Sequence, residues 1–175
     1  DIYENNVRLT QLVNDLLNIS RLDQGRVPDK SEETDLVAVV QEMVSDFKGQ
    51  AKEKHIIINL QIECTIPKVL IDAERFREVV ENLLSNSIKY NKEKGSIKVK
   101  MECLKGEIIL SVKDTGIGIP KEDQEKLFSK FFRGSNAVSS DTTGSGLGLY
   151  VIREYVRGWG GEISFTSSEE GTEFI

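Results

Sequence analysis

Amide, ammonium and aromatic side chains gather in one stretch of the sequence. Asn82 and Asn86 lie four residues apart, and Lys89 and Tyr90 follow them. On a helix over 73–90, which the spacing of apolar residues predicts, these four side chains share one border of the buried stripe. Such groups beside a hydrophobic wall could hold a metal-bound phosphate and a planar base. A solvated helix face is the alternative, and the pattern taken alone favours it. The other polar side chains fall outside this border: Glu78, Glu81 and Ser85.

A carboxylate occupies an apolar position in the segment DTGIGIP, residues 114–120. Strand alternation places Asp114 on the same face as Leu110 and Val112, where an unpaired carboxylate would cost free energy. The exocyclic amine of a purine would provide the missing donor. Gly116 and Gly118 lack Cβ atoms, so a flat ligand could approach their backbone. The common alternative is a glycine-containing turn capped by aspartate.

Three glycines, Gly144, Gly146 and Gly148, stand at the beginning of a predicted helix in the segment TTGSGLGLYVI, residues 142–152. Backbone amides at a helix N-terminus attract anions, so phosphate fits this position. The run is not a dinucleotide fingerprint, because no strand leads into it and no acidic residue stands at the expected place downstream. It is not a P-loop either, since no Gly-Lys-Ser/Thr follows. The glycines therefore indicate phosphate binding by a different architecture.

The elements that must position these residues predict an α/β fold. The predicted helices are 1–25, 36–52, 73–90 and 146–159, with a short helical piece at 121–128. The predicted strands are 55–62, 68–71, 97–103, 107–113, 162–167 and one that begins near 172. We expect a two-layer sandwich of a mixed β-sheet with helices on one face, preceded by a single long helix. Residues 27–34 are predicted to be a polar linker, and the long loop 118–143 is of a length that is usually functional or mobile.

Composition excludes several classes of protein. The chain has 175 residues, 38% of them apolar and 30% charged, which suits a domain with a core rather than a disordered tail. Its 23 basic and 29 acidic residues give a net charge of −6, which argues against a general nucleic-acid binder. No apolar run reaches the roughly 20 residues of a membrane span. Cys64 and Cys103 are expected to be reduced and unreactive in a cytosolic protein, and His55 to be an ordinary residue at a strand edge.

Five segments in this order resemble the ATP-binding catalytic domain of sensor histidine kinases from two-component systems, within the gyrase, MutL and histidine-kinase superfamily. They correspond to the N box, the first glycine box, the F box and the second and third glycine boxes: ENLLSNSIKYN (81–91), DTGIGIP (114–120), KLFSKFFRGSN (126–136), TTGSGLGL (142–149) and GTEF (171–174). Residues 5–26 resemble the end of the second helix of the dimerisation and histidine-phosphotransfer domain. The implied division is that helix over 1–26, a linker over 27–34 and the catalytic domain over 35–175.

The resemblance implies that the site binds ATP and Mg²⁺. Asn86 would ligate the Mg²⁺ that bridges the phosphates, and Asn82 would assist nearby. Lys89 would contact phosphate, Tyr90 would lie against the adenine or ribose, and Asp114 would accept from the adenine amine. Arg133 would meet the γ-phosphate, and 119–143 would form a mobile lid whose flank is docked by three aromatic rings: Phe128, Phe131 and Phe132. The remaining implied nucleotide-binding residues are Gly116, Gly118, Ile119, Phe132, Gly144, Ser145, Gly146, Leu147, Gly148 and Thr172.

One departure from the superfamily pattern favours a kinase over an ATPase. In the hydrolysing relatives a glutamate stands four residues before the metal-binding asparagine and orients the attacking water. Here that position is Asn82, whose amide is no useful base, and Glu81 points outward from the helix. The site is therefore expected to hold ATP while an external nucleophile attacks.

The implied partners are the dimerisation and phosphotransfer domain of the same protein, a second copy of the chain, and the receiver domain of a response regulator. No nucleic acid and no membrane contact is expected for this fragment. The fragment would be cytoplasmic, with a parent protein that the cell membrane could anchor. Two alternatives are disfavoured. The helix over 5–24 argues against an anti-sigma-type serine kinase, and the intact Asn86, Asp114, Lys89 and glycines argue against a nucleotide-sensing module without catalysis. An upstream histidine followed by an acidic residue would decide for the histidine kinase.

Overall fold

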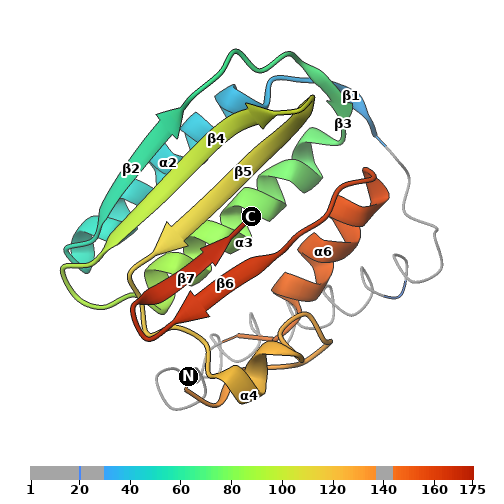
Figure 1. The fold of residues 1–175 in the computed structure, drawn as a ribbon. Coiled ribbons are helices and arrows are strands. Elements are labelled where there is room, and N and C mark those ends of the chain that lie inside the picture. The colour runs from blue at the N-terminus through green and yellow to red at the C-terminus, as the bar shows by residue number, and fades with distance from the viewer. Residues whose placement is uncertain (1–19, 21–29, 137–143) are drawn as a thin grey trace, which may run out of the picture.

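The computed structural model describes residue 20 and residues 30–136 and 144–175. Within these residues a five-stranded sheet has the strand order β2-β4-β5-β7-β6. Figure 1 shows three helices on one face of this sheet: α2 (Leu36–Glu53), α3 (Ala73–Lys89) and α6 (Gly148–Gly158). The predicted α/β sandwich with helices on one face is therefore confirmed. The predicted helix over 1–25 lies outside the described residues.

The sheet is mixed, as the sequence predicts. Its strands are β2 (Ile57–Ile62), β4 (Ser96–Leu104), β5 (Glu107–Asp114), β6 (Phe165–Ser168) and β7 (Gly171–Phe174). Strand β2 pairs with β4 in parallel, and every other pairing in the sheet is antiparallel. Lys105 and Gly106 join β4 to β5, and both have left-handed φ angles, of 52° and 88°. This combination is typical of the tight hairpin turn that Lys-Gly predicts.

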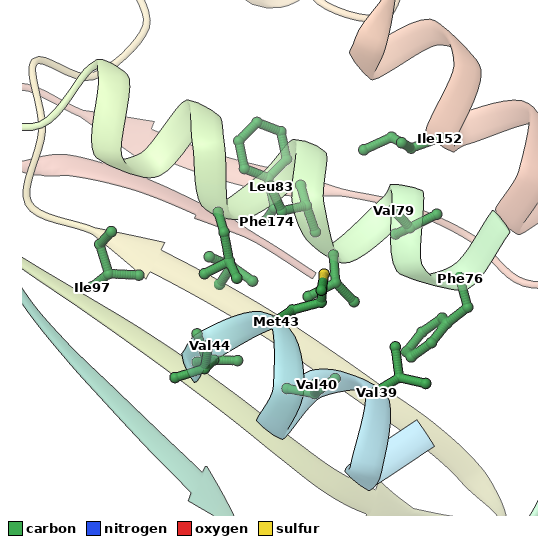
Figure 2. Close-up of a cluster of buried hydrophobic side chains, with 14 of the residues drawn as sticks. Val39, Val40, Met43, Val44, Phe76, Val79, Leu83, Ile97, Ile152 and Phe174 are labelled. Atoms are coloured by element: carbon green, nitrogen blue, oxygen red, sulfur yellow. The ribbon is translucent and has the colours of Figure 1, made fainter. Parts of the chain in front are cut away.

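The core lies between the sheet and the helices, with α3 in the middle. Figure 2 shows Val40 and Met43 of α2 facing Val79 and Leu83 of α3 across this space, with Ile97 of β4 nearby. The alternation predicted for β4 is confirmed, because its buried residues Ile97, Val99 and Met101 all point to the helices. On the other side of α3, Trp159 packs against the rings of Phe76 and Tyr155, with centroids 6.3 and 6.4 Å apart.

Aspartate side chains fix where two of these helices begin. Asp35 caps α2 by accepting a hydrogen bond from the Ala38 N–H at 3.0 Å. Asp72 caps α3 by accepting from the N–H groups of Glu74 and Arg75 at 3.1 and 3.2 Å. Each cap satisfies backbone donors that the first turn leaves unpaired. The second cap sets the register of α3 and hence the orientation of the polar residues in its later turns.

The predicted linker is partly a strand. Residues Glu32–Thr34 form β1, which pairs antiparallel with β3 (Val69–Ile71). The Thr34 hydroxyl donates to the Ile71 carbonyl at 3.1 Å within this pair. Three residues are too few to show a period of two, and the partner strand lies more than thirty residues away in the sequence. The predicted boundary of the domains remains a prediction.

His55 lies in a turn rather than in a strand. Helix α2 continues to Glu53, and β2 begins only at Ile57. The Ile56 N–H bonds the Ala51 carbonyl and the His55 N–H bonds the Lys52 carbonyl, at 2.8 and 3.0 Å. This is the C-terminal helix motif in which one residue takes a left-handed conformation, here His55 with φ of 56°. The side chain is exposed, with Nδ1 3.7 Å from a Glu93 carboxylate oxygen.

The two cysteines form a disulfide, so the prediction of reduced thiols is wrong for this structure. Cys64 and Cys103 are bonded with their Cα atoms 5.9 Å apart. Strand β2 pairs with β4 at a constant offset, from Ile57 opposite Ser96 to Ile62 opposite Met101. Continued by two residues, that register brings Cys64 opposite Cys103. The spacing in the sequence does not reveal this neighbourhood, because it depends on which strands pair.

Other differences from the predicted elements are small. Helix α4 spans only Lys121–Gln124, and turns follow it as far as the F box. Strand β6 begins three residues later than predicted. Among residues 30–136 and 144–175, no helix combines the length and the apolar character needed to cross a bilayer.

Candidate functional site

A pocket of about 320 Å³ opens at one end of the sheet, between the later turns of α3, the end of β5 and the beginning of α6. Figure 1 shows this end beside α4. Polar groups line the pocket together with an apolar wall that includes Ile117, Ile119 and Leu149. The pocket thus combines a surface for a flat apolar group with donors and acceptors for a charged one.

Asp114 supplies the buried acceptor of the pocket. Its Oδ1 accepts from the N–H groups of Gly116 and Thr172, at 2.8 and 3.1 Å. Both donors approach the same oxygen, so Oδ2 retains the capacity to accept from a ligand. The side chain is only 7% exposed. Burial raises the pKa of the Asp114 carboxyl, and the hydrogen bonds from the two backbone N–H groups offset part of that rise.

Close packing explains the glycine that follows Asp114. A Cβ atom at Gly116 would collide with the Tyr90 carbonyl and would approach Asp114 Oδ1 to 2.8 Å. The absence of a side chain therefore lets the turn after β5 lie directly on the end of α3. Gly116 is buried behind this contact and does not line the pocket itself.

The amide pair lines the pocket where α3 meets the beginning of α6. Asn86 Nδ2 donates to Asn82 Oδ1 at 3.3 Å, which leaves Asn86 Oδ1 as an acceptor or a ligand for a cation. The Asn82 amide lies directly against the backbone of Gly148, since a Cβ atom there would collide with it. Lys89 Nζ lies 5.1 Å from the centre of the Tyr90 ring and close to Gly144. Two amides and an ammonium group therefore face the glycine-rich segment.

The glycine-rich segment packs against the F box. Gly144 and Gly146 both have positive φ angles, of 126° and 71°. A Cβ atom at Gly146 would lie 2.7 and 2.8 Å from backbone atoms of Phe131 and Phe132. This contact places the N–H groups at the beginning of α6 beside the pocket, in the position where helix N-termini attract anions.

Residues 118–136, which follow β5 and border the pocket, are held by hydrogen bonds and ring packing. The Ile119 N–H donates to the Ser167 hydroxyl at 2.9 Å, and Asn136 Nδ2 donates to the Gly118 carbonyl at 2.9 Å. Phe128 packs on Phe165 with ring centroids 5.8 Å apart, as predicted. Phe131 is the exception, because its side chain is 57% exposed and does not dock on the domain. Residues 137–143 of the predicted lid lie outside the described residues.

Most residues predicted for the site line this pocket. They are Asn82, Asn86, Lys89, Tyr90, Asp114, Gly118, Ile119, Phe132, Arg133, Gly144, Ser145, Gly146, Gly148 and Thr172. Two predicted residues do not line it: Gly116, which lies behind Asp114, and Leu147. The Leu147 side chain is 1% exposed and belongs to the core instead.

Sequence reasoning missed several lining residues. They are Ser85, Ile117, Leu127, Gly134, Asn136, Leu149 and Phe174. Ser85 was assigned to the outside of α3, yet it is half-buried and its hydroxyl bonds the Asn82 carbonyl at 3.2 Å. A signal for it was available, because residues 82, 85, 86 and 89 have the spacing of one helical face. The apolar members could not be found in this way, since their neighbourhood depends on the tertiary fold.

The described residues contain no cluster of three or more histidine, cysteine or acidic side chains that could hold a metal ion by itself. A cation in the pocket would therefore depend on amide oxygens, such as that of Asn86, and on oxygens of the ligand. Mg²⁺ is commonly held in this way, by few protein ligands together with phosphate and water. The donor set fits a magnesium nucleotide better than a free metal ion.

Comparisons with known proteins agree with this chemistry. The model of the family "Histidine kinase-, DNA gyrase B-, and HSP90-like ATPase" matches residues 71–175. The chain is 35% identical over 164 residues to the sensor histidine kinase WalK of Bacillus subtilis, covering 93% of this chain and 27% of WalK. It is 33% identical over 165 residues to the signal transduction histidine-protein kinase BarA of Escherichia coli, covering 91% of this chain and 18% of BarA. The chain thus spans about a quarter or less of these relatives.

Solved structures give the same result. The match to full-length ShkA in complex with AMPPNP covers 98% of this chain and 35% of the ShkA chain, with a TM-score of 0.84 and 26% identity. The match to histidine kinase ThkA, in complex with the response regulator protein TrrA, covers 99% of this chain and 47% of the ThkA chain, with a TM-score of 0.77 and 27% identity.

Proposed function

Because the chain belongs to the family of histidine kinase-, DNA gyrase B- and HSP90-like ATPases, we propose that its pocket binds MgATP and presents the γ-phosphoryl group to a histidine on another segment. The observation that carries this proposal is that one pocket has a buried acceptor at one end and groups suited to phosphate and a cation at the other. A buried carboxylate, Asp114, lies at one end, and the Asn82, Asn86 and Lys89 side chains face a glycine-rich helix start at the other.

The adenine would bind at the Asp114 end. Asp114 Oδ2 would accept a hydrogen bond from the exocyclic amine, while Gly116 and Thr172 hold Oδ1. Guanine has a carbonyl at this position, so two acceptors, that oxygen and the Asp114 carboxylate, would face each other without a donor. Adenine should therefore be preferred. Tyr90, Gly118, Ile119 and Phe132 would enclose the ring and the ribose, since these residues line the pocket.

The triphosphate would extend toward α6. Lys89 would contact phosphate oxygens, and the backbone around Gly144, Ser145, Gly146 and Gly148 would surround them with N–H donors. Asn86 Oδ1 would ligate Mg²⁺, with Asn82 holding the Asn86 amide through their hydrogen bond. When bound, Mg²⁺ would neutralise phosphate charge as the transferred group leaves. Arg133, which lines the same pocket, would meet the γ-phosphate.

The arrangement of α3 supports phosphoryl transfer rather than hydrolysis. Asn82 provides an amide where a hydrolase needs a base for the attacking water. Its nearest acidic neighbours on the helix do not replace it: Glu81 is exposed, and the Glu78 carboxylate accepts from the Tyr155 hydroxyl at 2.9 Å. The pocket would therefore hold ATP until a nucleophile from outside reaches it.

The proposed nucleophile is a histidine on a dimerisation and phosphotransfer domain, to which residues 1–26 would contribute the last helix. The relatives named above are sensor histidine kinases, and the ThkA structure contains a response regulator protein. By analogy, this chain would act as part of a dimer that passes the phosphoryl group to a receiver domain in the cytoplasm. His55 is not the proposed acceptor, because it belongs to the turn that ends α2 and is not among the residues that line the pocket.

Incubation with γ-labelled ATP and Mg²⁺ tests the proposal. The chain alone should bind ATP without acquiring label, and label should appear on a separately added histidine-bearing dimerisation domain. That label should be stable in alkali and labile in acid, as a phosphohistidine is. The matched controls are Asp114→Asn in this chain and loss of the acceptor histidine in the added domain. Label on His55, or ATP turnover as fast as that of a dedicated ATPase, would contradict the proposal.

A further inference from the structure

The Cys64–Cys103 pair lies at the end of the sheet opposite the pocket. Cys103 pairs with Ile108 near the beginning of β5, whereas Asp114 ends the same strand six residues later. At about 3.4 Å per residue this separation is roughly 20 Å. Figure 1 shows the corresponding end of β4 beside β1 and β3, away from α4. The pair therefore takes no part in nucleotide binding, and its chemistry is independent of the proposed function.

Backbone pairing brings the two thiols together whether or not they are bonded. The β2–β4 ladder keeps an offset of 39 residues from Ile57 to Ile62, and the two cysteines are also 39 residues apart. The Glu63 N–H extends the ladder by bonding the Met101 carbonyl at 2.9 Å. The residue that follows Glu63 is Cys64. Reduced thiols would consequently remain neighbours, at a high effective concentration.

The sulfur bond lies outside the main core. Neither cysteine belongs to the buried apolar cluster between the sheet and the helices. Cys103 is exposed and Cys64 is half-buried, so a small thiol or disulfide can reach the bond without unfolding of the domain. Exposed disulfides of this kind are the labile ones, whereas structural disulfides resist reduction.

We propose that Cys64 and Cys103 form a reversible redox modification site that reacts with low-molecular-weight disulfides such as glutathione disulfide. The exposed Cys103 thiolate attacks one sulfur of the small disulfide, which breaks that S–S bond and releases one glutathione thiolate. The Cys64 thiolate then attacks Cys103 Sγ in the mixed disulfide and releases the second glutathione. Two protein thiols are oxidised and one glutathione disulfide is reduced, and the two released glutathione thiolates take up the two protons that the protein thiols lose.

Closing the disulfide fastens the segment that leads from β2 to β3. Only residues 65–68 lie between Cys64 and the first residue of β3, and β3 pairs with β1. Strand β1 is the first strand of the described residues. The oxidised state should therefore hold the β1–β3 pair more firmly than the reduced state does. The partner of this site is a small thiol or disulfide, and its effect is confined to this end of the sheet.

Titration of the native 175-residue chain in glutathione redox buffers tests the site. After alkylation, mass spectrometry should show two labelled thiols under reducing conditions and none under oxidising conditions, with the change reversed without denaturant. Hydrogen exchange over 32–34 and 65–71 should slow at least about threefold on closure, while exchange near Asp114 stays unchanged. The site would be refuted if the bond opened only in denaturant, if it never formed, or if exchange in these segments did not respond.

Single variants test the order of attack. Cys64→Ser retains the exposed thiol and should accumulate a stable glutathione adduct on Cys103. Cys103→Ser retains only the half-buried thiol and should acquire glutathione several times more slowly. Equal rates for the two variants would overturn the assignment of Cys103 as the attacking residue. Unfolding curves of both variants in reducing buffer serve as the control, and they should match the reduced parent chain.

Discussion

The two ends of the five-stranded sheet are assembled in different ways. At the pocket end, Asp114 and the glycines around it belong to short segments whose residue types already indicate their chemistry. At the other end, Cys64 and Cys103 meet only because β2 pairs with β4 in one register. A site made of local segments can thus be recognised from sequence, whereas a site made by strand pairing cannot. The comparison also implies that changes at one end should leave the other unaffected.

Replacing both cysteines by serine should have the largest effect on stability. The disulfide closes a loop of 39 residues, so the oxidised parent chain should exceed the double variant by about 2–4 kcal/mol in free energy of unfolding. Urea denaturation measures this difference, and it should vanish under reducing conditions. ATP affinity, measured by calorimetry, should agree within about twofold. A tenfold loss of ATP affinity would show that the two ends are coupled.

Asp114→Asn, at the pocket end, should weaken ATP binding and leave the fold intact. Removing the proposed charged acceptor of the adenine amine should cost about 1.5–3 kcal/mol of binding free energy, or roughly 10- to 150-fold in ATP dissociation constant. The fold should persist, because the Asn side-chain oxygen can still accept from Gly116 and Thr172. Glu107→Gln at the exposed, opposite end of the same strand is the matched control and should bind ATP normally. An unchanged affinity in Asp114→Asn would remove Asp114 from the adenine site.

Gly146→Ala should cost about 1–2 kcal/mol in free energy of unfolding, because this position has a left-handed φ of 71° and abuts the backbone of the F box. It should also weaken ATP binding by displacing the glycine-rich segment. Gly158→Ala, at the end of the helix α6 that follows Gly146, is the control, since nothing lies within 4 Å of its added Cβ atom, and it should be neutral or stabilising. Equal melting temperatures of the two variants would contradict the tight packing at Gly146.

The smallest expected effect concerns pH. Burial raises the pKa of Asp114 above its value in the unfolded chain, so the fold favours the neutral carboxyl. The stability contributed by this group is complete below the unfolded pKa and is lost as pH rises through the folded pKa. In the empty protein, Asp114→Asn should therefore raise the melting temperature at neutral pH, with no advantage in acid. Melting curves across this range would exclude the effect if the difference were independent of pH.

Features made by residues close together in the chain were predictable from the sequence, whereas features made by distant residues were not. The long amphipathic helices, the β4–β5 hairpin and the polar face of α3 were predictable, because each depends on residues close together in the chain. Strand β1 was not, since Glu32–Thr34 is identified only by its remote partner β3. Within the site, Ser85 was missed although its spacing was informative, and Leu147 was assigned to the ligand although it belongs to the core. A motif therefore identifies which segment borders the pocket better than which of its side chains line it.

The contacts between α3 and α6 determine how much reorganisation the pocket needs. Asn82 lies against the Gly148 backbone, and one turn earlier on α3 the Glu78 carboxylate accepts from Tyr155 of α6. These two points fix the relative position of the helices before any ligand arrives. A ligand that joins the amide pair to the glycine-rich segment therefore meets a preorganised frame. Little of its binding free energy is therefore lost in aligning the two helices.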